Sequence, residues 1–286
     1  MTITITTSNV NGIRAAKRKG IEQWAAKNTP DVWCMQEVRA PQNEIDPIFD
    51  EFGFEYATAG RIADQSGLDR MNEICRDQGR AGVGLLSALP VIDKRYGLPG
   101  LAEDVDSGRW IEADVKTPQG YTVTVVCVYV HAGNTDDPEK MKQKYRFLDT
   151  MLVRMGQLRD EAAHGGKQAV LCGDFNIAHT PLDIKNAKAN EKHAGFLPEE
   201  RAYVDKWLGE LEFVDVMRSL CGDIQGPYTW WSQRGRAFDN NVGWRIDYQF
   251  ATPELAETAR GFVIDKAPTY DLRWSDHAPL SITYGV

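Results

Sequence analysis

Short apolar runs that end abruptly in polar side chains recur along this sequence, and they constrain its fold more than any other feature. Buried strands are expected at residues 3–7, 31–36, 121–130, 169–172, 245–251 and 280–284. Helices are expected at residues 14–27, 138–163 and 198–208, where Pro138 and Pro198 suit a first helical turn. Strands that alternate with helices favour an α/β fold of packed sheets with helices outside.

Length and composition fit one large globular unit. The chain has 286 residues, of which 42% are hydrophobic and 26% are charged, enough to bury a sizeable core. No Ser/Pro/Gly-rich linker divides it, so a single domain spanning residues 1–286 is expected. The formal net charge of −8 argues against a protein that binds nucleic acid by bulk positive charge. A local basic face on an acidic body is still compatible with nucleic acid.

Neither the first residues nor the cysteines indicate export. Residues 1–6 alternate in polarity and lack a basic stretch, which is typical of a strand and not of a signal peptide. The apolar run at residues 125–130 is too short to span a membrane. The five cysteines are widely spaced without a Cys-x-x-Cys pair, and Cys34, Cys127 and Cys172 lie in apolar runs. These observations favour buried free thiols and a cytoplasmic location.

The polar residues at the strand ends are of one chemical kind. They are Asn9 and Asn11 after the first run, Glu37 after the second, Tyr129 in the long run, Asp174 and Asn176 after the next, Asp247 within 245–251, and Asp276 and His277 before the last. A single Asp after Gly usually forms a turn or helix cap, but six such cases favour one shared site at an edge of the sheets.

The chemistry indicated is metal-assisted hydrolysis. Carboxylate and amide oxygens suit Mg²⁺ or Mn²⁺, and the clustered Cys and His that select zinc are missing from the motifs. His277 would pair with an Asp and act on a phosphate or a water, although a His beside Pro279 also serves as a cap. The sequence lacks a Gly-x-Ser-x-Gly elbow, a Walker loop and a dinucleotide fingerprint, which argues against acyl transfer, NTP hydrolysis and hydride transfer.

Six segments resemble bacterial exonuclease III and its AP-endonuclease relatives, in the same order. They are Asn9–Arg14 (NVNGIR), Gln36–Glu37 (QE), Gly173–Ile177 (GDFNI), Phe196–Arg201 (FLPEER), Asn241–Asp247 (NVGWRID) and Ser275–Pro279 (SDHAP). GDFN and SDH alone would indicate only the broader endonuclease/exonuclease/phosphatase superfamily, whereas FLPEER and VGWRID point to its DNA-repair branch. The resemblance implies an α/β fold, a four-layer αββα sandwich of two mixed β-sheets flanked by helices.

The same resemblance assigns a metal site. Glu37 is similar to the main metal-ligating carboxylate, with Asn9 and Asn11 alongside it. Asp276 would assist in binding metal or phosphate. A cation is physically reasonable here, because a cluster of carboxylates would otherwise repel an anionic substrate.

The catalytic roles implied by the resemblance fall on five further residues. Asp174 would orient or deprotonate the attacking water, supported by Asn176. His277, held by Asp247, would act on the side of the phosphate, and Tyr129 would contact the scissile phosphate. A phosphodiester needs these elements, because hydrolysis requires a positioned water and stabilisation of charge on the phosphate oxygens.

Substrate contacts are expected from aromatic and basic residues. By resemblance, Trp230, Trp244 and Ile246 line a pocket for a flipped-out sugar without a base, although tryptophans also commonly pack in a core. Trp231 is expected to point away. Arg14 and Arg245 are expected to bind DNA. Basic residues cluster at 14–19, 140–146, 185–192 and 234–245, and together they predict a phosphate track, although each alone is typical of a solvated face.

Two segments depart from the family pattern. His131-Ala132-Gly133 stands where relatives commonly have Pro-Asn or Pro-Gln before Gly, so His131 would replace an amide contact to DNA. The stretch Arg61–Arg80 is longer than usual, and its arginines (61, 70, 76 and 80) suggest an insertion that touches DNA.

The sequence therefore predicts a Mg²⁺-dependent DNA-repair phosphodiesterase, with Mn²⁺ as an alternative ion. It would act as a monomer in base excision repair, cleaving duplex DNA 5′ to abasic sites and trimming blocked 3′ ends as a 3′→5′ exodeoxyribonuclease. The alternatives are a superfamily phosphoesterase acting on RNA, a phosphoinositide or a lipid head group, and a DNA-binding protein with an inactive site. Side-chain identity does not rank endonuclease against exonuclease activity, because loop shape decides it.

Overall fold

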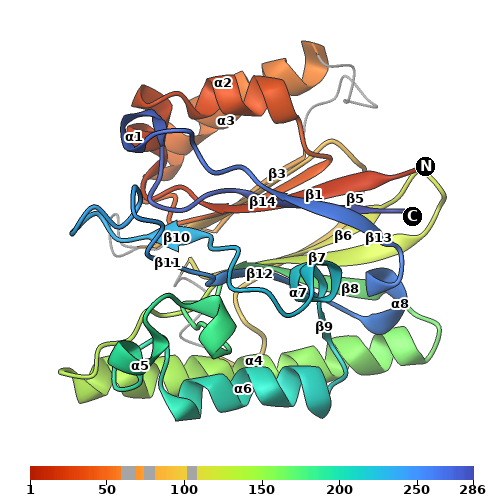
Figure 1. Ribbon diagram of the computed structural model, residues 1–286. Helices are drawn as coiled ribbons and strands as arrows, with labels where there is room; N and C mark the ends of the chain where they lie inside the picture. Colours follow the sequence, from red (N-terminus) through yellow and green to blue (C-terminus); the bar gives the residue numbers. More distant parts are fainter. Residues whose placement is uncertain (59–68, 74–80, 102–107) are drawn as a thin grey trace.

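Two six-stranded sheets pack face to face between outer layers of helices in the computed structural model of the protein (Figure 1). The structure describes residues 1–58, 69–73, 81–101 and 108–286. One sheet has the strand order β13-β14-β1-β2-β4-β3 and the other β5-β6-β7-β8-β12-β9. Each sheet holds one parallel pair, β1–β2 or β7–β8, among antiparallel neighbours. The predicted αββα sandwich of two mixed sheets is therefore confirmed.

The first sheet and its helices form one half of the sandwich. Its strands are β1 (Ile3–Asn9), β2 (Val32–Gln36), β3 (Asp69–Glu73), β4 (Val83–Ser87), β13 (Ala259–Ile264) and β14 (Leu280–Tyr284). Helices α1 (Ile13–Arg18), α2 (Ile21–Asn28) and α3 (Gln42–Thr58) cover its outer face. The single helix expected at residues 14–27 is wrong, because Gly20 adopts φ 97 and separates α1 from α2.

The second sheet and its helices form the other half. Its strands are β5 (Val91–Tyr96), β6 (Trp110–Lys116), β7 (Thr122–Tyr129), β8 (Gln168–Asp174), β9 (Val214–Asp215) and β12 (Asp247–Ala251). Helices α4 (Pro138–Ala163) and α6 (Pro198–Gly209) cover its outer face, as Figure 1 shows. The boundaries of α4 are those predicted, and its N-terminus is capped by Asp137, whose side chain accepts a hydrogen bond from the Lys140 amide.

Shorter elements complete the chain. They are α5 (Ala187–Asn190), α7 (Val216–Cys221), α8 (Pro253–Ala256), β10 (Trp230–Trp231), β11 (Gly243–Trp244) and the 3₁₀ turns Pro181–Asp183 and Tyr270–Leu272. Strands β10 and β11 form a separate two-stranded sheet. It lies at the end of the sandwich opposite the two termini (Figure 1).

The continuous apolar run of strand β7 illustrates how this sequence forms a layered fold. Val123, Val125 and Cys127 face the core between the sheets, whereas Val126 and Val128 pack under α4. Alternate side chains point to opposite faces, so a continuous apolar run is expected when both faces are covered. Cys34, Cys127 and Cys172 are all fully buried in the core between the sheets, as predicted.

The strand ends converge at one end of the sandwich. In the parallel pairs Asn9 is in register with Gln36, and Tyr129 with Asp174. Strand β12 runs the opposite way and begins with Asp247 beside Asp174. The predicted polar strand ends therefore meet at one edge, as the sequence indicated.

Two further expectations concern membrane spanning and the Arg61–Arg80 segment. Among the described helices, none combines the length and apolarity needed to cross a bilayer. The Arg61–Arg80 segment lies outside the described residues apart from 69–73, which form the edge strand β3 paired with β4. The proposed DNA contact of this segment stays a prediction.

Candidate active site

Asn9 lies at the centre of the converging strand ends. Its amide nitrogen donates to Glu37 Oε1 and to Asp174 Oδ2, each at 2.9 Å. Its amide oxygen accepts from the backbone N–H of Asn11 at 3.0 Å. The two flanking carboxylates require the Asn9 amide to present its donors to them, while its amide oxygen keeps a second lone pair. Asn9 therefore links the two carboxylates in this structure, and its predicted role as a metal ligand stays a prediction.

Glu37 connects the two sheets across the site. Its Oε1 also accepts a 2.7 Å hydrogen bond from the Tyr129 hydroxyl. Burial, together with the charge of Glu37, raises the pKa of Tyr129 well above its usual value, so the phenol remains a proton donor. Glu37 and Asn176 both adopt left-handed backbone conformations, with φ 53 and φ 50. Such strained positions cluster at functional sites, where surrounding contacts hold them.

Asp174 is fully enclosed on the opposite sheet. Its Oδ1 accepts from the backbone N–H of Asn176 at 2.9 Å, and Oδ2 accepts from the Asn176 side chain at 3.3 Å. Burial, with smaller contributions from Asp247 and Glu37, raises its pKa to about 7, although His277 acts in the opposite direction. A carboxyl group with such a pKa can exchange a proton near neutral pH.

His277 faces Asp174 and is held from behind. Its Nδ1 lies 2.9 Å from Asp247 Oδ2, and its Nε2 lies 3.8 Å from Asp174 Oδ2. Burial alone would lower the pKa of His277, but the charge and hydrogen bond of Asp247, with Asp174 and Asp276, raise it to about 10. The predicted Asp247–His277 pair is present in the structure, with the imidazole protonated at neutral pH.

A second polar group adjoins Glu37. Asp276 accepts hydrogen bonds from Asn11 Nδ2 at 2.7 Å and from Trp230 Nε1 at 3.2 Å. Burial opposes the change, but the charge of His277 and these hydrogen bonds lower the pKa of Asp276. Arg39 bridges the group, because it ion-pairs with Glu37 and donates to Asn11 Oδ1 at 2.9 Å.

These groups line one cleft of about 420 Å³. Its lining residues are Asn11, Glu37, Arg39, Tyr129, Ala132, Gly133, Asp174, Asn176, Ala194, Gly195, Trp230, Trp244, Ile246, Asp276 and His277. Trp230 and Trp244 meet edge to face, with ring centroids 6.0 Å apart, and form an apolar wall beside the carboxylates. Trp231 instead points into the core beside Phe238, as expected. A larger hollow of about 640 Å³ beside Tyr145 shares no lining residue with this cleft.

The donor set fits a hard divalent cation. Asp174, Asp247 and His277 bring polar atoms within 4.8 Å of one another, but a protonated imidazole has no free lone pair, so the carboxylate oxygens are the candidate ligands. Among the described residues, Asp247 Oδ1 is a buried oxygen without a hydrogen-bond partner. Carboxylate oxygens from Glu37 and Asp276 face the same cleft. Oxygen-rich sites of this kind suit Mg²⁺ or Mn²⁺.

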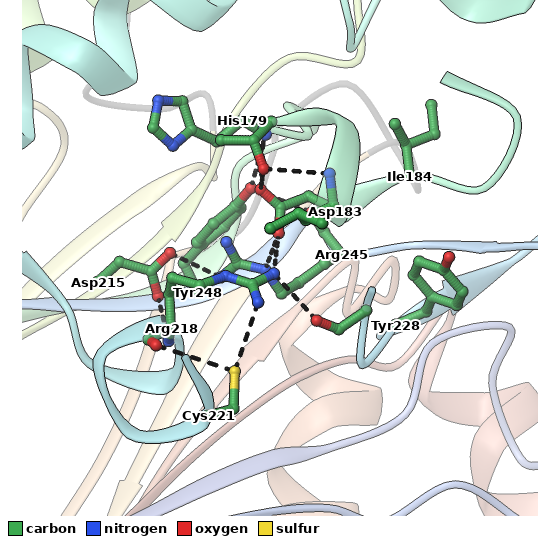
Figure 2. A network of polar contacts seen from close by, with 12 residues as sticks. His179, Asp183, Ile184, Asp215, Arg218, Cys221, Tyr228, Arg245 and Tyr248 are labelled. Carbon is green, nitrogen blue, oxygen red and sulfur yellow. Dashed lines mark hydrogen bonds and ion pairs between the residues drawn. The ribbon is translucent and has the colours of Figure 1, made fainter. Parts of the chain in front are cut away.

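Arg245 does not reach the cleft, which corrects its predicted role in DNA binding. The guanidinium is fully buried, with Nε 2.7 Å from Asp183 Oδ1 and Nη1 2.7 Å from Asp215 Oδ2. It also stacks over Tyr248 at 4.4 Å. Figure 2 shows this network, to which Arg218 adds a second cation against Asp183. Arg245 therefore anchors the segment that carries Trp244 and Ile246.

Three other basic residues make contacts within the protein. Lys144, expected in a basic surface cluster, is fully buried. Arg14 is half exposed and pairs with Glu44 outside the cleft lining, so its predicted contact with DNA stays a prediction. His131 packs edge to face on Phe147, and burial, followed by the charges of Arg109 and Lys144, lowers its pKa to about 3. A neutral His131 provides no charge for a phosphate.

Sequence reasoning missed several residues that hold the site. The Thr229 hydroxyl accepts from the backbone N–H groups of Ile246 and Asp247 at 3.2 and 3.1 Å. The Ser275 hydroxyl donates to the Asn9 carbonyl at 2.6 Å and accepts from the His277 N–H at 3.2 Å. Arg39 is close to Glu37 in sequence, but the left-handed backbone at both residues (φ 52 and φ 53) means that strand alternation could not have placed it.

Comparison with known proteins agrees with this geometry. Residues 6–277 match the Endonuclease/Exonuclease/phosphatase family, and the chain belongs to that family. It is 29% identical to an exodeoxyribonuclease of Bacillus subtilis, with 97% of this chain and 98% of the relative covered. It is 30% identical to a DNA-(apurinic or apyrimidinic site) endonuclease of Dictyostelium discoideum, with 96% of this chain and 68% of the relative covered.

A solved structure extends the similarity to three dimensions. An AP endonuclease from Archaeoglobus fulgidus matches with a TM-score of 0.81 and 29% identity, covering 99% of this chain and 100% of that chain. The predicted family resemblance is confirmed. The predicted class, a DNA-repair nuclease, agrees with these relatives.

Proposed function

We propose that this protein is a divalent-metal-dependent DNA-repair nuclease that hydrolyses the phosphodiester 5′ to an abasic site in duplex DNA and trims blocked 3′ ends. The observation that carries the proposal is the cleft itself. Asp174 and His277 line it beside the apolar wall of Trp230 and Trp244, and Asp247 holds His277 from behind. A nuclease of this kind needs proton transfer, charge stabilisation and a lesion pocket in one place.

Asp174 is the proposed acceptor for the proton of the attacking water. Its pKa of about 7 matches an acceptor that works near neutral pH. The hydrogen bonds from Asn9 and Asn176 fix the carboxylate, so that it orients the water as well as accepting the proton. Asn9 thus acts on the water indirectly.

His277 and Tyr129 are the proposed donors to the phosphate. The protonated imidazole stands 3.8 Å from Asp174 and presents positive charge where phosphate oxygens gain negative charge. The Tyr129 hydroxyl, which donates to Glu37 in this structure, would turn toward a phosphate oxygen. Glu37 with Asp276 would hold Mg²⁺ or Mn²⁺, which when bound neutralises the non-bridging oxygens.

The apolar wall is the proposed basis of lesion selection. Trp230, Trp244 and Ile246 offer a surface for a sugar but few hydrogen-bonding groups for a base. Flipping a nucleotide out of the stack costs least where pairing is already lost, which favours an abasic site.

The proposal is tested by incubating the protein with a duplex that contains one internal abasic-site analogue, in Mg²⁺ and in EDTA. An undamaged duplex with a recessed 3′ end is assayed in parallel. Metal-dependent incision 5′ to the lesion is expected, with some shortening of the recessed end. Shortening without incision would refute the endonuclease part, and inactivity on both duplexes would favour a different phosphoester.

A further inference from the structure

A buried ion pair lies behind the cleft and takes no part in the chemistry proposed above. Lys144 is in the second turn of α4 and Glu200 in the first turn of α6, and both side chains are 0% exposed. Lys144 Nζ lies 2.5 Å from Glu200 Oε1. Removing two charges from water has a free-energy cost that a good ion pair only roughly regains, so stability alone is a weak reason for such a pair.

The lysine holds two loops that form the floor of the cleft. Its ammonium group donates to the carbonyl of Asn176 at 2.9 Å and to the carbonyl of Ala132 at 3.2 Å. These loops follow β8 and β7, the strands that end in Asp174 and Tyr129. One ammonium group therefore ties both strand ends to α4.

The glutamate holds a third loop. Glu200 Oε2 accepts from the backbone N–H of Gly195 at 2.6 Å and from that of Leu197 at 3.0 Å. Gly195 adopts φ 92, and a Cβ there would lie 3.0 Å from the Trp244 ring and 3.2 Å from the Asn176 carbonyl oxygen. The loop is therefore pressed between the apolar wall and the loop that follows Asp174.

We propose that the Lys144–Glu200 pair positions the cleft, by fixing the three loops that set Asp174 and Asn176 against the Trp244 wall. The inference rests on the proposed nuclease function. The proposal also assigns a structural role to the FLPEER segment, because Glu200 is its second glutamate. Lys144 and Glu200 are positioning residues, since their charged atoms bind backbone groups behind the cleft.

The same helix offers a matched control. Arg154 lies about three turns after Lys144 on α4 and forms a buried bidentate pair with Glu112, with both distances 2.7 Å. Neither residue lines the cleft. Arg95 also contacts Glu112, so the carboxylate keeps a partner when Arg154 is replaced.

The experiment compares Lys144→Met with Arg154→Met in the full chain. Steady-state kinetics on the abasic duplex give kcat and KM, and hydrogen exchange reports the Gly195 and Leu197 amides. For Lys144→Met we expect kcat to fall about 100-fold, since misplacement of a catalytic group by 1 Å has effects of this size. The two amides should lose protection. Arg154→Met should keep the wild-type kcat and the protection of both amides.

A double variant separates positioning from the cost of an unpaired charge. Lys144→Met/Glu200→Gln removes both charges, so it should regain thermal stability relative to Lys144→Met but keep the low kcat. Recovery of both stability and kcat would overturn the proposal, as would native amide protection and kcat in Lys144→Met. An inactive wild type would refute the nuclease function instead. Hydrogen exchange of the Gly195 and Leu197 amides would still test whether the Lys144–Glu200 pair fixes the loops.

Discussion

Two groups of buried charge adjoin the segment that carries Trp244 and Ile246, and they differ in charge balance. The network of Figure 2 pairs two carboxylates with two guanidinium groups, whereas the cleft and the residue directly behind it hold four carboxylates against one imidazole and one guanidinium. The first group is Asp183, Asp215, Arg218 and Arg245; the second is Glu37, Asp174, Asp247, Asp276, His277 and Arg39. A balanced group stabilises a fold, while an excess of buried negative charge indicates a place for a cation and for chemistry.

The largest effect is expected from Asp174→Asn. Turnover on the abasic duplex should fall by about 10³-fold or more, because the proposed proton acceptor is lost. DNA binding, measured by fluorescence anisotropy, should stay close to that of the wild type. In EDTA the variant should melt at or above the wild-type temperature, since one of the excess buried charges is gone. Turnover comparable to the wild type would contradict the role of Asp174.

In the charge-balanced network of Figure 2, by contrast, removal of one charge should lower the stability of the fold. Arg245→Met leaves Asp183 with Arg218 and removes the guanidinium that pairs with buried Asp215, and its expected cost in unfolding free energy is about 3–5 kcal/mol. Urea denaturation measures this difference. A variant as stable as the wild type would show that the network does not hold the fold.

Asp247→Asn tests whether His277 is protonated and stabilised by Asp247. Loss of its charged hydrogen bond should cost about 1.5–3 kcal/mol at neutral pH. A raised His277 pKa stabilises the folded state fully below about 6.5, and this contribution is lost as pH rises through about 10. The stability gap between the variant and the wild type should therefore be widest below pH 6.5 and narrow toward pH 10. A gap that widens as pH rises would contradict a protonated His277.

The smallest effect concerns the cation. At a Mg²⁺ concentration ten times its dissociation constant, the folded state gains about 1.4 kcal/mol, which thermal unfolding detects. Glu37→Gln should need more Mg²⁺ for the same gain, whereas Arg218→Met should keep the wild-type response. Equal Mg²⁺ responses of Glu37→Gln and the wild type would remove Glu37 from the metal site.

Local signals explain what the sequence could predict. Helix α4 was predictable because Asp137 and Pro138 mark its start, and the site was predictable because polar residues end apolar runs. Gly20, which breaks the expected 14–27 helix, adopts a left-handed conformation that periodicity does not reveal. Lys144 was misplaced on the surface because its partner, Glu200, is remote in sequence and adjacent only after α4 and α6 pack together.

The same limit applies to Arg245. Its neighbours Trp244 and Ile246 do line the cleft, and alternation along an extended segment would have placed the arginine on the opposite face. Its partners Asp183 and Asp215 come from distant parts of the chain, so its burial could not be predicted from local sequence. Burial of a charge depends on non-local pairing, which single-residue patterns do not contain.

The three thiols enclosed between the sheets can serve as intrinsic probes for separation of the two sheets. Cys34, Cys127 and Cys172 come from β2, β7 and β8, so an alkylating reagent reaches them only when the two halves of the sandwich part. Cys221, partly exposed beside Arg218, provides an internal reference for reagent reactivity. The labelling rate of the enclosed thiols relative to Cys221 would time the separation of the sheets with no added probe.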